Sequence, residues 1–277
     1  MKLSERLPLL LNMARLHWVD FKKLHKPTRN DADVLVSLTS IPSRLGIVHY
    51  TVMSLLLQSR PPARIILWLH DDLRDNIPEA LAELCGARFE IRYSALDSRT
   101  PHRKLVPSLL TFPDKTIVTC DDDQYYSRHW LKCLVDCAQA NPGAIVAQRY
   151  RKMSFDTQGE VKPYRDWKYD RAVQACSAEH LAVGFGGVLY PSHSLHEDVL
   201  KSDIYLSCCP RADDLWFKAM AYLNGTRYIA TPVRRPHYEL MDSQVVSLKA
   251  ENVREDGNRS QWIQLCERYP ELKKIGH

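Results

Sequence analysis

The feature that most constrains the fold is the alternation, from Asp33 onward, of short apolar runs with segments of helical periodicity. Strands that are apolar on both faces and separated by helices form a mainly parallel sheet covered on both sides. The pattern therefore predicts an α/β fold whose ligand site lies at the carboxyl ends of the strands. The predicted strands span 34–40, 64–70, 88–94, 116–120 and 144–150, and the predicted helices span 44–59, 77–85, 103–112 (interrupted by Pro107) and 128–141.

Length, net charge and cysteine spacing limit the kinds of protein that this sequence can encode. The 277 residues contain no Gly/Ser-rich or Pro-rich linker, which favours a single domain with extensions. Lys and Arg outnumber Asp and Glu by 38 to 33, a mild excess rather than the dense basic stripe of a nucleic-acid-binding protein, so we expect no nucleic-acid partner. The eight cysteines form no CxxC pair and no zinc spacing, which is typical of reduced core residues in a cytoplasmic protein.

The two ends of the chain are interpreted separately. The first 26 residues combine leucines with basic residues, but the apolar run is far shorter than the ~20 residues that cross a bilayer, and no signal-peptide cleavage site follows it. This segment is either a helix packed on the domain or a basic amphipathic segment on the inner face of the cell membrane. We assign 1–30 to an N-terminal amphipathic helical extension, 31–240 to the main domain, and 241–277 to a C-terminal helical extension with its last helix over 260–275.

Three consecutive aspartates, Asp121 to Asp123, directly follow the apolar strand 116–120. Neighbouring carboxylates repel one another, and their burial is costly unless a cation or hydrogen bonds compensate. The chain has no GxxxxGK[ST] loop, and its glycines at 184–187 do not form GxGxxG. Mg²⁺ or Mn²⁺ commonly takes one or two carboxylates and completes its shell with phosphate and water. The triplet therefore predicts a divalent ion on nucleotide phosphates; the alternative is that it caps a helix starting near Ser127.

The segment "TIVTCDDDQYY" resembles the DxD motif of GT-A-fold nucleotide-sugar glycosyltransferases. Three later segments resemble further motifs of that family in the expected order: 183–191 the glycine-containing loop of the sugar pocket, 211–220 the acidic motif beneath the acceptor, and 234–238 the late histidine ligand. The segment 37–45 is similar to the first strand and turn of bacterial polysaccharide and lipopolysaccharide glycosyltransferases. The resemblance covers roughly 33–240.

This resemblance implies a GT-A, Rossmann-like fold and a metal-dependent glycosyltransferase of the hexosyltransferase type. The donor would be a nucleotide-diphosphate sugar, and the acceptor a hydroxyl of a saccharide or lipid-linked glycan of lipopolysaccharide, O-antigen or capsule. It also implies a role for each matching residue. Mn²⁺ or Mg²⁺ would be held by Asp121, Asp123 and His237; the nucleotide and sugar would contact Thr39, Ser40, Arg44, Asp71, Asp121, Asp122, Gly186 and Gly187; and the diphosphate would contact Lys104, with Arg103 and His102 as alternatives.

The second acidic motif supplies the catalytic candidates. In an inverting transfer, a carboxylate takes the acceptor proton while the anomeric carbon is attacked from the face opposite the leaving nucleotide. By resemblance to inverting members, Asp214 is the base and Asp213 contacts a sugar or acceptor hydroxyl; a retaining reaction would remove this assignment. The alternative is an ordinary helix start with Asp213 as N-cap. The segment 149–170 is either an acceptor loop that stacks Tyr150, Tyr164, Trp167 and Tyr169 on sugars or a surface insertion.

Two other functions stay open at this point. A sugar nucleotidyltransferase shares the α/β rim and the metal, but it should carry an early Gly-rich, Lys- or Arg-bearing phosphate loop, which 37–45 lacks. A non-catalytic metal- or polyanion-binding protein would need no second acidic motif.

Overall fold

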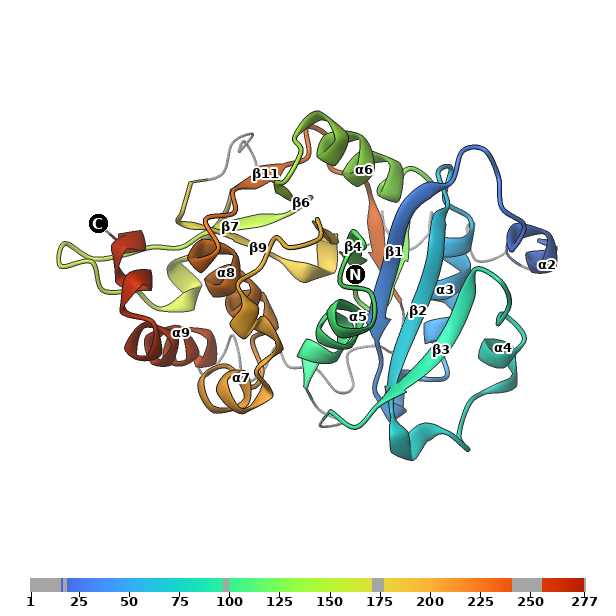
Figure 1. The fold of residues 1–277 in the computed structure, drawn as a ribbon, viewed down its shortest axis with the longest axis horizontal. Helices are drawn as coiled ribbons and strands as arrows, with labels where there is room; N and C mark the ends of the chain where they lie inside the picture. Colours follow the sequence, from blue (N-terminus) through green and yellow to red (C-terminus); the bar gives the residue numbers. More distant parts are fainter. Residues whose placement is uncertain (1–15, 17–18, 97–99, 171–176, 241–255, 277) are drawn as a thin grey trace.

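The computed structural model describes residues 16, 19–96, 100–170, 177–240 and 256–276. Within these residues the chain builds a seven-stranded sheet with the order β11-β6-β10-β4-β1-β2-β3 (Figure 1). Only β10 is antiparallel to both of its neighbours in this sheet; the other pairings are parallel. The predicted α/β fold with a mainly parallel sheet is thus confirmed. The strands are β1 (Ala32–Thr39), β2 (Pro62–His70), β3 (Phe89–Ser94), β4 (Ile117–Thr119), β6 (Ile145–Ala147), β10 (Val188–Tyr190) and β11 (Tyr228–Ala230).

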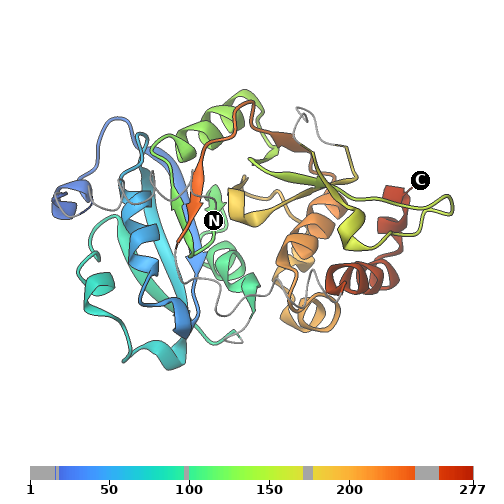
Figure 2. The same ribbon diagram turned by 180° about the vertical axis from the view of Figure 1, so that it is seen from behind.

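Both faces of the sheet are covered because successive side chains of a strand point to opposite sides. Ile117 belongs to one buried cluster and Val118 to another. The cluster of Val118 contains side chains of α3 (Val48–Leu56), α4 (Glu79–Ala82) and α6 (Trp130–Ala140), and that of Ile117 contains side chains of α7 (Ser202–Cys208), α8 (Asp213–Leu223) and α9 (Gly257–Arg268). Figures 1 and 2 show α7, α8 and α9 gathered at one end of the molecule and β1 to β3 with α3 and α4 at the other.

Two predicted elements differ in detail. The helix expected over 103–112 is a 3₁₀ turn, η3 (Pro101–Lys104), followed by α5 (Val106–Thr111). Pro107 does not interrupt this helix but lies in its first turn, where an amide without a partner is normal. The run 144–150 divides into β6 and a separate strand, β7 (Tyr150–Lys152).

Two small sheets complete the fold. In one, β5 (Gln124–Tyr126) pairs antiparallel with β12 (His237–Glu239), which brings the late histidine segment against the aspartate triplet. In the other, β7 pairs with β8 (Lys168–Asp170) and with β9 (His180–Ala182).

Most of the aromatic side chains singled out in the segment 149–170 belong to the core of the protein. Tyr150, Tyr164 and Trp167 are buried in the core, so these three do not form an open platform for sugars. Tyr169, by contrast, is 43% exposed.

The described residues of the N- and C-terminal extensions pack on the domain. Leu16 is buried against Tyr125 and Leu240, and α2 spans Phe21–Leu24, but most of the predicted N-terminal extension lies outside the described residues. The predicted final helix over 260–275 is confirmed only in part: α9 buries Trp262 and Leu265 but ends at Arg268, and the 3₁₀ segment η9 (Pro270–Gly276) follows.

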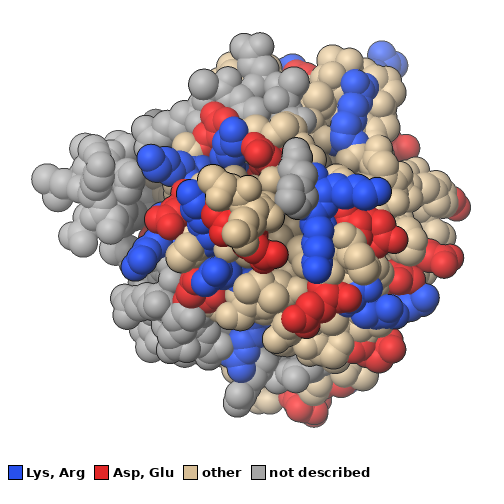
Figure 3. All heavy atoms as spheres, turned by 90° about the vertical axis from the view of Figure 1, so that its left-hand side faces the viewer, with Lys and Arg blue, Asp and Glu red and all other residues tan. Residues whose placement is uncertain are grey.

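None of the described helices has the length and apolarity needed to cross a membrane. On the face that carries α9, acidic and basic side chains alternate instead of gathering into one patch (Figure 3).

Candidate active site

The aspartate triplet lies between β4 and β5, at the carboxyl edge of the sheet. Because β4 runs parallel to β1, the residues that follow both strands meet there. Ser40 Oγ donates to Asp122 Oδ2 at 2.5 Å, and Arg44 Nη1 donates to Asp122 Oδ1 at 2.8 Å. Residues that follow the first and fourth strands of the predicted order thus contact one another, and both carboxylate oxygens of Asp122 are bound within the protein. A capping role for the triplet is excluded, since β5 intervenes before α6 begins at Trp130.

Asp123 is the least compensated carboxyl of the triplet. Its Oδ1 accepts a hydrogen bond from Gln124 Nε2 at 3.1 Å, and its Oδ2 lies 3.3 Å from Arg44 Nη1. Burial, followed by the charges of Asp121 and Asp122, raises the pKa of Asp123 to about 7. A carboxyl in this state would gain from a further positive charge.

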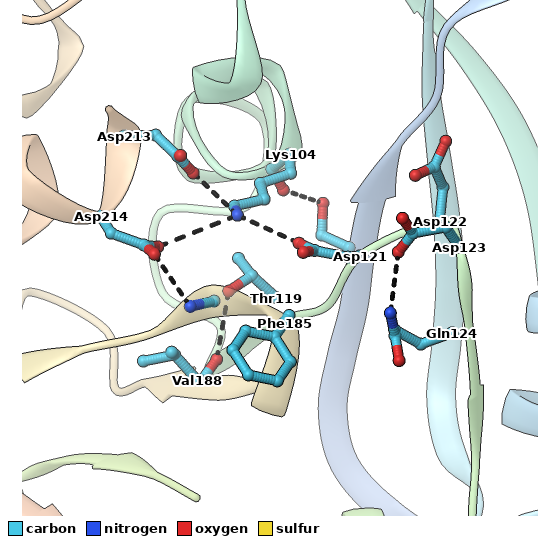
Figure 4. Close-up of polar contacts among 12 residues, drawn as sticks. Lys104, Thr119, Asp121, Asp122, Asp123, Gln124, Phe185, Val188, Asp213 and Asp214 are labelled. Atoms are coloured by element: carbon cyan, nitrogen blue, oxygen red, sulfur yellow. Dashed lines mark hydrogen bonds and ion pairs between the residues drawn. The ribbon is translucent and has the colours of Figure 1, made fainter. Parts of the chain in front are cut away.

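Lys104 joins the first aspartate of the triplet to the second acidic motif (Figure 4). Its Nζ lies 3.3 Å from Asp121 Oδ1, 2.8 Å from Asp213 Oδ2 and 4.0 Å from Asp214 Oδ1, and its side chain is only 8% exposed. The carboxylates hold the pKa of Lys104 well above its ordinary value. The structure thus divides the triplet, because Asp121 faces Lys104 whereas Asp123 faces Gln124.

The basic neighbours of Lys104 belong to the core. His102 is fully buried, stacks on Tyr205 at 4.3 Å between ring centroids, and accordingly has its pKa lowered to about 3 by burial and by the charge of Lys104. Arg103 is also buried and donates to the main-chain oxygen of Leu96. Of the three basic residues predicted at this turn, Lys104 is the one whose contacts with the acidic cluster are seen among the described residues.

Asp213 and Asp214 open α8, but neither is its N-cap, since that position is Ala212. Asp214 Oδ2 accepts from the backbone N–H of Gly184 at 3.0 Å. Burial and then the charge of Asp213 raise the pKa of Asp214 to about 7, against the opposing effects of Lys104 and of that N–H. The Asp214 side chain is 26% exposed and that of Asp213 only 9%, so Asp214 is the member of the pair that a ligand can reach.

The glycine-containing turn η5 (Gly184–Gly186) lies against both motifs. A Cβ on Gly184 would lie 2.7 Å from Lys104 Nζ and 2.8 Å from Asp214 Oδ1. Gly187 has φ 91°, and a Cβ there would lie 2.4 Å from a ring carbon of Trp130. The sequence predicted Gly186 and Gly187 as site residues but not Gly184, although Gly184 stands in the same segment, 183–191.

His237 and Arg149 lie on the other side of this turn. Strand pairing sets His237 opposite Tyr126, and its Nδ1 is buried without a hydrogen-bond partner among the described residues. Burial and then the charge of Arg149 lower the pKa of His237 to about 4, so the ring is neutral. Arg149, which the sequence did not single out as a site residue, has its guanidinium over the Phe185 ring at 5.1 Å.

Two predicted donor residues have other partners. Thr39 Oγ1 donates to the main-chain oxygen of Trp68 at 2.8 Å and so ties β1 to β2. Asp71 begins the exposed turn η2 (Asp71–Leu73), and its carboxylate pairs with Arg74 at 2.5 Å. Within the described residues the structure gives neither side chain a contact with the triplet.

The residues at the triplet fit a divalent ion that is shared with a ligand. Among the described residues, no group of three or more His, Cys, Asp and Glu side chains is arranged to hold a metal by itself. Mg²⁺ needs only one or two protein carboxylates when phosphate and water complete its shell. The raised pKa of Asp123 is the feature that such an ion would compensate.

Comparisons with known proteins bear on the fold. No family model matches the chain, and no curated protein matches its sequence. The fold is similar to that of residues 1–349 of TarS from S. aureus, at 13% identity and a TM-score of 0.50, over 86% of this chain and 72% of that chain.

Two further solved structures have lower scores. The same TarS fragment in complex with UDP has 15% identity and a TM-score of 0.48, over 79% of this chain and 62% of that one. The 4-diphosphocytidyl-2C-methyl-D-erythritol synthase from Anaerococcus prevotii has 12% identity and a TM-score of 0.47, over 85% and 97% of the two chains. At these identities the likeness concerns the fold alone, and the mostly parallel sheet flanked by helices is that of a Rossmann-like GT-A domain.

Proposed function

We propose that this chain is a nucleotide-sugar-dependent glycosyltransferase that moves a sugar to a hydroxyl of a glycan acceptor. The observation that carries the proposal is the meeting of two acidic motifs from distant parts of the sequence at Lys104, on the carboxyl edge of the sheet. Ligands of open α/β sheets bind at this edge. A purely structural role would not need five aspartates around two cations.

The donor would bind on the side of the triplet. Asp123, together with Asp121 and His237, would hold Mn²⁺ or Mg²⁺, which when bound would supply positive charge to the diphosphate as it leaves. Ser40 and Arg44 hold Asp122 and thereby fix the loop that carries Asp123. Arg149, on the Phe185 ring, adds a positive side chain on the same side of the glycine turn.

The acceptor would bind on the side of α8. Asp214 is the accessible carboxyl of its pair, and the N–H of Gly184 orients it. It would take the proton of the acceptor hydroxyl while that oxygen attacks the anomeric carbon from the face opposite the nucleotide, which inverts the configuration. A pKa of about 7 suits this role, because a general base works best when its pKa lies near the working pH. Asp213 would hold Lys104 and contact a sugar or acceptor hydroxyl.

The biological setting proposed for this reaction is the synthesis of a bacterial surface glycan at the inner face of the cell membrane. This part rests on the similarity of 37–45 to polysaccharide and lipopolysaccharide glycosyltransferases and on the basic, leucine-rich start of the chain.

The test is a panel of UDP-, GDP-, CDP- and dTDP-linked sugars, assayed for release of the nucleotide with Mn²⁺, with Mg²⁺ and with EDTA. We expect at least one donor to be hydrolysed slowly in the presence of metal, and Asp123→Asn to lower that rate at least ~100-fold. Asp136→Asn, a change of an exposed aspartate on α6, is the matched control and should keep the rate. Equal rates in EDTA would contradict the metal assignment, and hydrolysis of none of the donors would contradict the proposed function.

A further inference from the structure

The ammonium group of Lys104 is committed to carboxylates on both sides of the site. A nearly buried lysine is costly unless opposite charges compensate, and here the nearest two are Asp213 at 2.8 Å and Asp121 at 3.3 Å. The sequence alone suggested that Lys104 binds the donor diphosphate. To do so, the ammonium group would have to give up ion pairs that span the two motifs.

The surroundings of Lys104 also fix its place. Its main-chain oxygen accepts from Ser37 Oγ at 2.6 Å, and Ser37 is fully buried on β1. The Cα of Gly184 lies so close to Lys104 Nζ that a Cβ there would be 2.7 Å from it. The backbone is therefore tied to the central sheet, and the head group is enclosed between η5 and α8.

The groups that face Asp214 give Lys104 a distinct function. From its own helix comes Asp213, from the loop after β4 Asp121, from η3 Lys104, and from η5 the N–H of Gly184. The phenols of Tyr164, on η4 (Tyr164–Asp166), and of Tyr190, on β10, lie within electrostatic range and are neutral, because burial raises the pKa of both. Among these described side chains only Lys104 is positive, so it is the one side chain that favours the ionised form of Asp214.

We propose that Lys104 is a positioning residue that couples the donor side of the site to the acceptor side and does not bind the donor diphosphate. Its ammonium group holds Asp121 and Asp213 together, and its charge keeps Asp214 ionised for the acceptor. This inference rests on the proposed function, in which Asp214 is the base. If Lys104 has this role, the donor diphosphate is bound by other groups, on the side of η5 that faces the aspartate triplet.

The experiment compares Lys104→Met and Lys104→Arg with the wild type across pH. In Lys104→Met the acid limb of kcat should move upward by ~1–3 pH units, since a neighbouring opposite charge lowers a carboxyl pKa by about that much. Activity lost at pH 7 should therefore return in part at higher pH, while the affinity for nucleoside diphosphates (UDP, GDP, CDP and dTDP, by calorimetry) changes less than ~3-fold. Lys104→Arg, which keeps the charge, should leave the limb near its wild-type position.

Lys218→Met is the matched control. Lys218 is a buried lysine on the same helix as Asp214, and its Nζ lies over the Tyr228 ring at 5.2 Å. Its loss should lower stability without moving the acid limb. A tenfold or greater loss of nucleoside diphosphate affinity in Lys104→Met with an unmoved limb would overturn the inference and restore the diphosphate role.

A second measurement needs no activity, so it separates this inference from the proposed function. The Asp214 carboxyl resonance, assigned by its absence in Asp214→Asn, is titrated by NMR in metal-free protein. Its midpoint should rise in Lys104→Met. It should fall in Asp121→Asn, which removes a negative charge that raises the Asp214 pKa and leaves Lys104 with fewer partners. If Lys104→Met does not fold, Lys104→Gln is measured in its place, and an unmoved midpoint overturns the inference.

Discussion

At the scale of single residues, the site contains more acidic than basic side chains among the described residues. Arg44 is shared by Asp122 and Asp123, and Lys104 by Asp121 and the pair that opens α8. Among the described residues, two cations thus pair with five carboxyls. Burial, followed by the charges of the neighbouring aspartates, raises the pKa of Asp123 and of Asp214 to about 7. Such an imbalance costs stability and is typical of sites that receive a charged ligand.

The Asp123→Asn substitution should therefore stabilise the free protein. The folded-state pKa of about 7 stands above the ordinary 3.8, so the wild type loses stability as the pH rises from 3.8 to 7. The gain for the asparagine variant should be fully present above pH 7, on the order of 2–4 kcal/mol, and should fade as the pH falls towards 3.8. Urea unfolding at pH 8 and at pH 4 checks this, and a variant less stable than the wild type at pH 8 would show that Asp123 is compensated in the free protein.

At the scale of elements, the glycine turn explains why two motifs far apart in sequence can meet. Gly187 has a left-handed φ of 91° and packs directly on Trp130 of α6, while Gly184 is pressed between Lys104 and Asp214. A side chain at either position would separate the turn from its neighbours.

Gly187→Ala should destabilise the protein by ~2 kcal/mol or more, through strain at positive φ together with the clash against Trp130. Gly143→Ala is the control, because Gly143 also has a positive φ, 75°, but a Cβ there meets nothing within 4 Å. Chemical unfolding gives the loss of unfolding free energy in each variant, and the difference between the two losses measures the cost of the clash with Trp130. Equal losses in the two variants would mean that Trp130 moves aside at little cost.

The sequence predicts the elements better than it predicts their contacts. Strong apolar runs located the strands β1 to β4, and the aspartates that follow β4 and open α8 were recognised from local sequence alone. The interruption at Pro107 was wrong, because the same residue is favourable in a first helical turn. The roles of Gly184 and Arg149 arise only when η5 approaches α8 and β12, and no local pattern records such an approach. The burial of Trp167 was missed for the same reason.

At the scale of the whole molecule, the described residues of the N-terminal extension, 16 and 19–30, lie beside the domain but outside its sheet. Leu16 is buried with Tyr125 and Leu240, and Arg88 binds the main-chain oxygens of Leu24 and Lys26. The described part of the extension is thus anchored to the domain from Leu16 onward.

Deleting residues 2–15 should leave the fold intact, since these anchoring contacts remain, and should weaken binding to anionic vesicles. The basic and leucine-rich composition of the deleted segment is the reason for this expectation. Co-sedimentation with vesicles containing phosphatidylglycerol, compared with neutral vesicles and with high salt, measures the effect. Unchanged co-sedimentation would favour the alternative that the segment only packs on the domain.

The central claim is that Asp214 is the base of a sugar transfer, and the most direct test is Asp214→Asn. The amide keeps the size of the side chain but cannot accept a proton at neutral pH. With a donor identified from the panel, we predict that turnover falls ~10²- to 10⁴-fold while the donor dissociation constant, measured by calorimetry, changes less than ~3-fold. Asp213→Asn should be milder, and the product should have inverted configuration. Transfer by Asp214→Asn at the wild-type rate, an effect confined to Asp213→Asn, or a product that retains the donor configuration would contradict the claim.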